Sequence, residues 1–148
     1  MIRVGVIGAG GRMGAEVCRA VDGADDTDLV AAVDPGAAGR PLGEVAGVGG
    51  DLEVASELDA LVDAGVEVAV DFTHPDAVAD NVRWLLDHGV HAVVGTTGLS
   101  DDDLADLRER AAGSDANAFL APNFAIGAVL LMPVSYTHLR AHETDSYL

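Results

Sequence analysis

The chain contains no lysine, so all eight of its basic residues are arginines, and they are set against 25 acidic residues. The formal net charge at pH 7 is −17. A chain with this charge is repelled by the phosphate backbone of nucleic acids and by anionic membrane surfaces. We therefore expect neither nucleic acid nor a membrane among its partners.

Cysteine and long apolar runs are also scarce. Cys18 is the single cysteine, which excludes a disulfide framework within one chain, and its place on the apolar side of a predicted helix indicates a buried structural thiol. The longest apolar runs are shorter than the ~18–20 residues that span a bilayer. The N-terminus enters a predicted strand at once, without the separate apolar segment of a secretory signal. We expect a cytoplasmic protein.

Glycine is abundant, and one glycine cluster organises the start of the chain. An alternating apolar run from Ile2 to Ile7 predicts a buried strand, the segment Gly8 to Gly14 interrupts it, and apolar residues at helical spacing follow. In this context a G-x-G-x-x-G pattern indicates a dinucleotide site, because a helix N-terminus offers N–H groups to a pyrophosphate. Here the last glycine comes one position late, giving G-x-G-G-x-x-G. An ordinary strand-to-helix turn remains the alternative.

An acidic residue lies where a dinucleotide site needs one. Leu29–Val33 reads as a second strand that ends at Asp34, 34 − 14 = 20 residues after Gly14. A carboxylate at this distance accepts hydrogen bonds from the adenosine ribose hydroxyls. It would repel the 2′-phosphate of NADP, and Arg40 is the nearest arginine that could offset this. The pattern favours NADH over NADPH, and a plain turn aspartate is the alternative.

The rest of the chain alternates between strand and helix patterns, which predicts an α/β fold of the Rossmann type. Such a fold is doubly wound, with a mainly parallel sheet and helices on both faces. Apolar residues make up 49% of the 148, enough for the core of one domain. The strands expected after residue 50 are 52–54, 66–70, 90–94 and 118–121; the helices are 57–63 with Ser56 as N-cap, 75–88, 101–112 with Ser100 as N-cap, and one beginning in 125–132.

Several loops should meet at one edge of this sheet, because each follows the carboxyl end of a strand. They carry the glycine cluster, Thr73, the Gly95–Gly98 segment and Asn123. In an open α/β sheet this edge binds ligands. The acidic run Asp101–Asp103 is read as favourable charge at a helix N-terminus, without a metal.

The histidines offer no metal pattern either. His74, His88 and His91 are interpreted as turn or surface residues, although His74 could approach a ligand through its loop. His138 and His142 would share a helix face, but they lack the order and the further ligand of a zinc site. We expect no bound metal.

Four segments together resemble one enzyme family. They are VGVIGAGGRMG at the N-terminus, DFTHP from Asp71, VVGTTG from Val93 and APNFAIGAVLLM from Ala121. The set is similar to 4-hydroxy-tetrahydrodipicolinate reductase, also called dihydrodipicolinate reductase, of the diaminopimelate route to lysine. The resemblance implies these cofactor contacts: Gly8, Ala9, Gly10, Gly11, Arg12 and Met13 at the pyrophosphate, Asp34 at the ribose, Phe72 and Thr73 beside the cofactor, and Gly95, Thr96, Thr97, Ala121, Pro122, Asn123 and Phe124 at the nicotinamide end.

The resemblance also implies an activity. The family is an oxidoreductase acting on CH or CH2 groups that uses NADH or NADPH, and it transfers a hydride to a cyclic dicarboxylate. Its proton donor and dicarboxylate-binding groups lie in a second domain with a histidine-pair and lysine motif followed by Ser-Gly-Thr, a motif absent here. We therefore expect no catalytic residue in this chain and cofactor binding without turnover. The family's homotetramer contacts lie mainly in the absent domain.

The end of the chain departs from the family. Residues 1–132 are expected to form the dinucleotide-binding domain, truncated before the substrate domain, and 133–148 a tail that resembles a translated sequencing adapter. Two other functions remain open at this stage. One is an NAD(H)-sensing Rossmann module without chemistry, and the other is the first domain of another amino-acid dehydrogenase.

Overall fold

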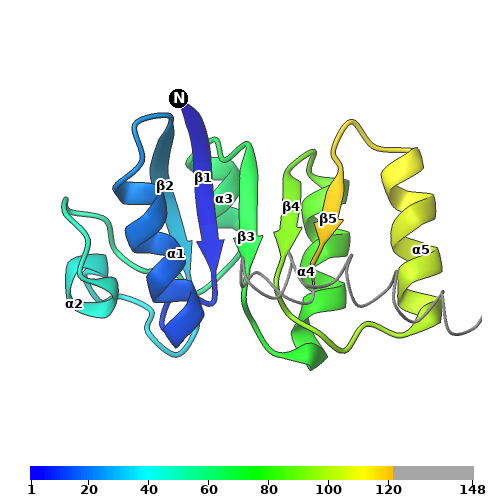
Figure 1. The fold of residues 1–148 in the computed structure, drawn as a ribbon, viewed down its shortest axis with the longest axis horizontal. Helices are drawn as coiled ribbons and strands as arrows, with labels where there is room; N and C mark the ends of the chain where they lie inside the picture. The colour runs from blue at the N-terminus through cyan, green and yellow to red at the C-terminus, as the bar shows by residue number, and fades with distance from the viewer. Residues whose placement is uncertain (122–148) are drawn as a thin grey trace, which may run out of the picture.

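The described part of the chain folds around five parallel strands, shown in Figure 1. The computed structural model describes residues 1–121. Strand order is β2-β1-β3-β4-β5, so the direction of winding reverses between β1 and β3. The elements in chain order are β1 (Ile2–Ile7), α1 (Arg12–Asp22), β2 (Thr27–Val33), α2 (Leu42–Ala46), α3 (Asp59–Asp63), β3 (Val68–Asp71), α4 (Pro75–Asp87), β4 (His91–Val94), α5 (Asp101–Ala112) and β5 (Ala118–Leu120).

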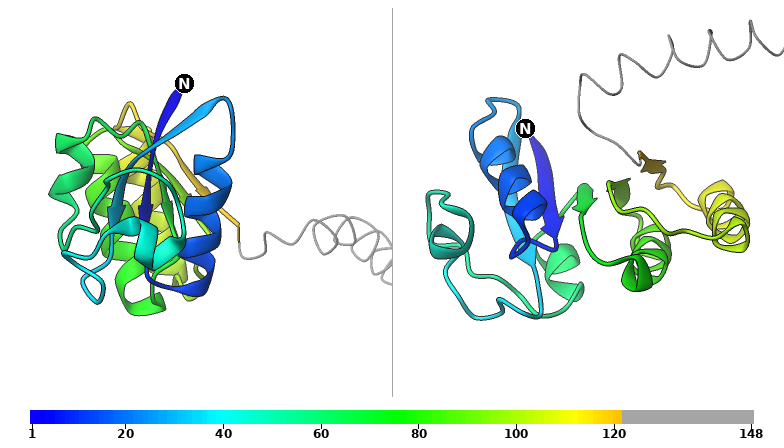
Figure 2. Two further views of the ribbon diagram at one scale, coloured as in Figure 1. Left: turned by 90° about the vertical axis from the view of Figure 1, so that its left-hand side faces the viewer. Right: turned by 60° about the horizontal axis from the view of Figure 1, so that its bottom comes forward.

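Helices cover both faces of the sheet, as predicted for a Rossmann-type fold. In the left view of Figure 2, α1 lies on one side of the strands and α4 on the other. The apolar core is divided accordingly. Val6 and Cys18 belong to the cluster under α1 and α2, whereas Ala69, Val82 and Leu85 belong to the cluster under α3, α4 and α5.

Cys18 is the buried structural thiol that the sequence predicts. Its side chain is fully buried and has no disulfide partner. Burial raises the pKa of this thiol to about 11, so it is neutral at physiological pH.

Two sequence predictions about the segment before β3 are wrong. Residues 52–54 form no strand: the Val54 N–H donates to the Arg40 carbonyl at 2.9 Å, so the loop before α2 takes the hydrogen bonds that a sheet would need. The helix predicted from 57 begins at Asp59, and Ser56 does not cap it. The Ala55 N–H still donates to Ala32 of β2 at 2.8 Å, which keeps the chain extended up to that point.

Other boundaries move by one or two residues, and one predicted helix lies outside the described residues. The strand predicted over 66–70 is Val68–Asp71, because the Val66 N–H closes the turn after α3 by donating to the Leu61 carbonyl at 2.9 Å. Helix α5 begins and ends where the sequence predicts, with Ser100 as its N-cap in a capping box. The helix predicted in 125–132 lies beyond residue 121.

Candidate functional site

The loops at the carboxyl ends of β1, β2, β3 and β4 are tied together by backbone hydrogen bonds. The Gly8 N–H donates to the Val33 carbonyl at 2.8 Å, and the Phe72 N–H donates to the Ile7 carbonyl at 3.1 Å. The Gly95 N–H donates to the Asp71 carbonyl at 3.0 Å. The sheet therefore presents these loops as one continuous edge, at the point where the winding reverses.

The glycine turn between β1 and α1 leaves no room for side chains. Gly8 has a φ of +83°, and a Cβ there would lie 2.6 Å from the Phe72 carbonyl oxygen. A Cβ on Gly14 would lie 1.9 Å from the Gly8 carbonyl oxygen. Gly11 is the N-cap of α1, and its N–H donates to the Gly8 carbonyl at 3.1 Å. The turn therefore brings bare backbone to the N-terminus of α1.

Asp34 lies beside this turn at the end of β2. Its Oδ2 accepts a hydrogen bond from the Gly10 N–H at 2.8 Å, and its Oδ1 accepts one from the Gly36 N–H at 2.9 Å. A Cβ on Gly10 would lie 2.7 Å from Oδ2, so glycine at this position permits the contact. The carboxylate is half-buried and is held in a fixed orientation by two backbone donors.

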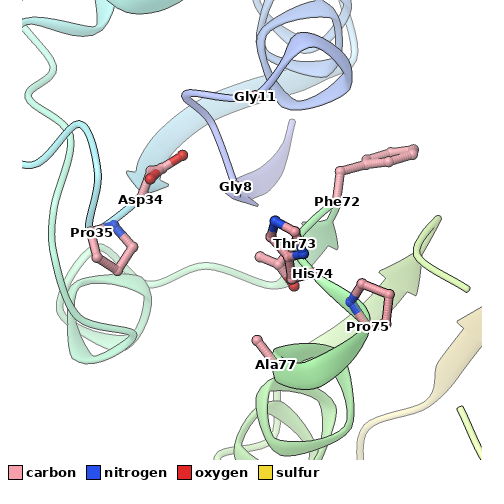
Figure 3. A pocket seen from close by; sticks show the side chains of 9 residues that line it. All are labelled: Gly8, Gly11, Asp34, Pro35, Phe72, Thr73, His74, Pro75 and Ala77. Atoms are coloured by element: carbon pink, nitrogen blue, oxygen red, sulfur yellow. The ribbon is translucent and has the colours of Figure 1, made fainter. Parts of the chain in front are cut away.

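A cleft of about 530 Å³ opens between β1 and β3. Figure 3 shows Asp34 on one side of it and the residues that follow β3 on the other, with Gly8 between them. A second hollow, of about 360 Å³, lies on the far side of Asp34 and is lined by Arg40 and Glu44 as well as the glycine turn. The lining residues of the main cleft are Gly8, Gly11, Asp34, Pro35, Phe72, Thr73, His74, Pro75 and Ala77.

A buried carboxylate to which the sequence patterns assign no role lies next to this cleft. Asp71 ends β3 and is fully buried. Its Oδ1 accepts hydrogen bonds from the Thr73 N–H at 2.8 Å and from the Thr73 hydroxyl at 2.6 Å. Its Oδ2 accepts one from Asn81 Nδ2 at 2.8 Å. Burial raises the pKa of Asp71 above its ordinary value, and the hydrogen bonds from Thr73 and Asn81 oppose this rise.

Most of this chain matches a known protein family. Residues 2–124 match the family described as "Dihydrodipicolinate reductase, N-terminus". The chain belongs to this family. The 4-hydroxy-tetrahydrodipicolinate reductase of Thermobifida fusca is 50% identical over 133 residues, which are 89% of this chain and 46% of that protein. The reductase of Nocardia farcinica is 48% identical over 144 residues, 97% of this chain and 50% of that protein. The chain thus spans about half the length of these reductases.

Solved structures agree with the family assignment. A dipicolinate-bound dihydrodipicolinate reductase from Paenisporosarcina sp. TG-14 matches with a TM-score of 0.76 and 35% identity, covering 89% of this chain and 51% of that one. The WlbA dehydrogenase from Thermus thermophilus, solved with NAD and α-ketoglutarate, shares only the fold: its TM-score is 0.67 at 21% identity, with 82% of this chain and 41% of that one covered. Within residues 1–121 no helix combines the length and apolar character needed to cross a bilayer.

The residues that the reductase resemblance assigns to the cofactor have different environments. Gly8, Gly11, Asp34, Phe72 and Thr73 line the main cleft. Arg12 and Met13 are exposed in the first turn of α1, whereas Ala9 is fully buried in the core beneath the turn.

The loop after β4 lies next to the cleft without lining it. The Thr96 hydroxyl donates to the Thr73 carbonyl at 3.0 Å, and Thr97 is exposed. The Ala121 N–H donates to the Val94 carbonyl at 2.9 Å, which extends the pairing of β5 with β4. Pro122, Asn123 and Phe124 lie outside the described residues, as does the predicted tail.

The three histidines among residues 1–121 fall into two groups. His74 is the N-cap residue of α4 and lines the cleft. His88 stacks on Trp84 with ring centroids 3.9 Å apart, and His91 Nδ1 accepts a hydrogen bond from the Asn117 N–H. In residues 1–121 no three side chains of the metal-binding types gather in one place.

The acidic run at the start of α5 has the helix-end role predicted for it. Asp103 accepts hydrogen bonds from the Ser100 backbone and hydroxyl, which completes the capping box. Arg83 also donates to Asp103, at 2.7 Å. Hydrogen bonds from Ser100 first, and then from Arg83, lower the pKa of Asp103.

Proposed function

We propose that this chain is the nucleotide-binding half of a 4-hydroxy-tetrahydrodipicolinate reductase and that it binds NADH or NADPH in the cleft between β1 and β3. The observation that carries the proposal is the pairing of Asp34 with the glycine turn. A carboxylate oriented by Gly10 and Gly36 lies beside a helix N-terminus that bare backbone approaches.

The pyrophosphate would lie over the start of α1. The first turn of a helix leaves backbone N–H groups outside the helical hydrogen-bond pattern, and the helix dipole adds positive potential there. The glycine turn leads bare backbone into the start of this helix, so a phosphate can come close to these groups. Arg12, exposed in the same turn, adds the positive charge that an otherwise acidic chain needs at this point.

The adenosine ribose would lie on Asp34. Each carboxylate oxygen accepts one backbone N–H and keeps a further lone pair for a ribose hydroxyl. A 2′-phosphate at this position would be repelled by the carboxylate, which favours NADH. Arg40 lines the hollow on the far side of Asp34 and could partly offset that repulsion. We infer a preference for NADH with NADPH also accepted.

The nicotinamide end would lie toward Phe72 and Thr73. When bound, the nicotinamide supplies the hydride for the reaction. The residues of this chain would orient it and exclude water on the sheet side, with Phe72 and Thr73 among the residues that line the cleft. The relative solved with dipicolinate supports a cyclic dicarboxylate as the substrate class, and the groups that bind it would belong to the other half of the reductase.

Titration of the chain with NADH and with NADPH by isothermal calorimetry tests the proposal. Wild type should bind NADH more tightly than NADPH. Asp34→Ser should weaken NADH binding by about 10- to 100-fold, because two hydrogen bonds to a charged acceptor are lost. The same change should reduce the difference in affinity between NADH and NADPH, since the repulsion of the 2′-phosphate disappears.

Asp28→Ser provides the matched control for that variant. Asp28 lies near the other end of β2 and pairs loosely with Arg3 at 3.9 Å. Asp28→Ser changes the net charge by the same amount as Asp34→Ser but lies away from the cleft. NADH affinity should therefore stay within about twofold of wild type. A wild-type chain that binds neither cofactor at millimolar concentration refutes the proposal, as do equal effects of the two variants.

A further inference from the structure

Asp71 and Asn81 join three elements beneath the cleft through side-chain hydrogen bonds. Asp71 ends β3, Thr73 lies in the loop that follows, and Asn81 lies in the second turn of α4. Asn81 Nδ2 donates to Asp71 Oδ2 at 2.8 Å and to the Thr73 hydroxyl oxygen at 3.3 Å. Both protons of one amide group therefore act in this network.

The network also occupies the polar groups of Thr73. Its hydroxyl gives its proton to Asp71, its N–H donates to the same carboxylate oxygen, and its carbonyl accepts the Thr96 hydroxyl. What Thr73 turns toward the glycine turn is its methyl group, since Cγ2 lies 3.3 Å from where a Cβ of Gly8 would be. The hydroxyl holds the loop in place and has no proton left to donate to a ligand.

The donors that surround the Asp71 carboxylate are all neutral. They are the Thr73 backbone, the Thr73 hydroxyl and the Asn81 amide. Within residues 1–121, this buried carboxylate is balanced by neutral donors, and such a group adds little net stability compared with an apolar side chain of the same size. Its directional bonds fix one geometry of the chain, here at the wall of the cleft.

We propose that Asp71 and Asn81 are positioning residues, which hold the Phe72–Thr73 loop, and through it Thr96, in the geometry that receives the nicotinamide half of the cofactor. This inference rests on the proposed function. It assigns the Thr73 hydroxyl to the support of the loop instead of to direct contact with the cofactor.

Comparison of Asn81→Ala with Val82→Ala separates positioning from general stability. Val82 is the next residue of α4 and is fully buried in the core. Both variants should lower Tm. Asn81→Ala should raise the Kd for NADH about 10-fold, whereas Val82→Ala should leave it within about twofold.

A double-mutant cycle with Thr73→Val tests the role of the hydroxyl. Valine keeps the methyl group and removes the hydroxyl. If Thr73 acts through the network, the double variant Thr73→Val with Asn81→Ala should bind NADH about as weakly as either single variant, at about a 10-fold loss. If Thr73 contacts the cofactor directly, the two losses should multiply to about 100-fold, and the inference fails.

Exchange of the two side chains supplies a rescue. Asp71→Asn leaves one acceptor oxygen at position 71. If that oxygen accepts the two Thr73 donors, the amide nitrogen faces the Asn81 amide, and the bond between positions 71 and 81 is lost. Asp71→Asn with Asn81→Asp restores a donor and an acceptor and should recover NADH affinity to within about threefold of wild type. If wild type binds NADH and the two variants Asn81→Ala and Val82→Ala bind it with equal affinity, this inference alone is overturned. If wild type binds neither NADH nor NADPH, the inference and the proposed function are both overturned.

Discussion

At the scale of single residues, the close packing of β1, α1 and the glycine turn depends on Gly14. This residue is the third of α1 and is buried against the Gly8 carbonyl. Alanine is normally better than glycine inside a helix by about 1 kcal/mol. A Cβ at this position, however, would lie 1.9 Å from a backbone oxygen, which has no side-chain torsion through which to move away. The steric effect therefore outweighs helix propensity here.

We expect Gly14→Ala to lower the free energy of unfolding by about 3 kcal/mol or more, because α1 must move away from the turn. Urea denaturation followed by circular dichroism measures the loss. Gly49→Ala is the control, since no atom lies within 4 Å of a Cβ there. It should change stability by less than about 1 kcal/mol. Equal stability of the two variants would show that α1 can shift freely on the turn.

At the scale of elements, α4 and α5 are joined by an ion-pair network. Arg83 of α4 contacts Asp103 and Asp106 of α5, and Arg110 of α5 contacts Asp87 of α4. The hydrogen bond from Arg83, followed by that from Arg110, lowers the pKa of Asp106 below its ordinary value. A carboxyl whose pKa is lowered by folding contributes stability above its unfolded pKa and loses that contribution as the pH falls through the folded one.

Arg83→Gln should therefore be destabilising at pH 7, and the difference from wild type should shrink as the pH falls from about 5 to about 2. Urea denaturation at a series of pH values measures both chains. Arg108→Gln is the control, because Arg108 is exposed on α5, forms no ion pair in the described part of the chain and carries the same charge. A difference for Arg83→Gln that stays constant with pH would assign its effect to packing.

Sequence patterns predict some boundaries of helices and strands correctly and miss others. Local patterns are enough for α5, where Ser100 and Asp103 are three residues apart and form the cap themselves. They fail at Ser56, because hydrogen bonds between residue 55 and β2 decide where α3 begins. Asp34 follows from its distance to the glycine turn. The role of Asn81 could not be predicted, since it depends on a ten-residue separation closed by the packing of α4 on β3.

At the scale of the whole molecule, net charge and ion pairs act in opposite directions. The net charge of −17 destabilises a chain of this size through self-repulsion. The Arg83 and Arg110 network favours the fold, but its members are partly exposed, so each pair contributes little to stability. Salt screens both effects. Repulsion among so many carboxylates should be the larger of the two, so screening should stabilise the chain.

We therefore expect Tm to rise when NaCl increases from 0.02 M to 0.5 M, by about 2–4 °C for each kcal/mol of repulsion that is removed. Screening is nearly complete at the upper end of this range, because the Debye length falls to roughly 10 Å at 0.1 M and 3 Å at 1 M. The rise should therefore level off. Differential scanning calorimetry in NaCl and in Na2SO4 measures it. Equal rises at matched ionic strength indicate screening, whereas a continuing linear rise in sulfate alone indicates exclusion of that salt from the surface. A Tm that falls with NaCl would mean that the ion pairs between α4 and α5 outweigh the repulsion.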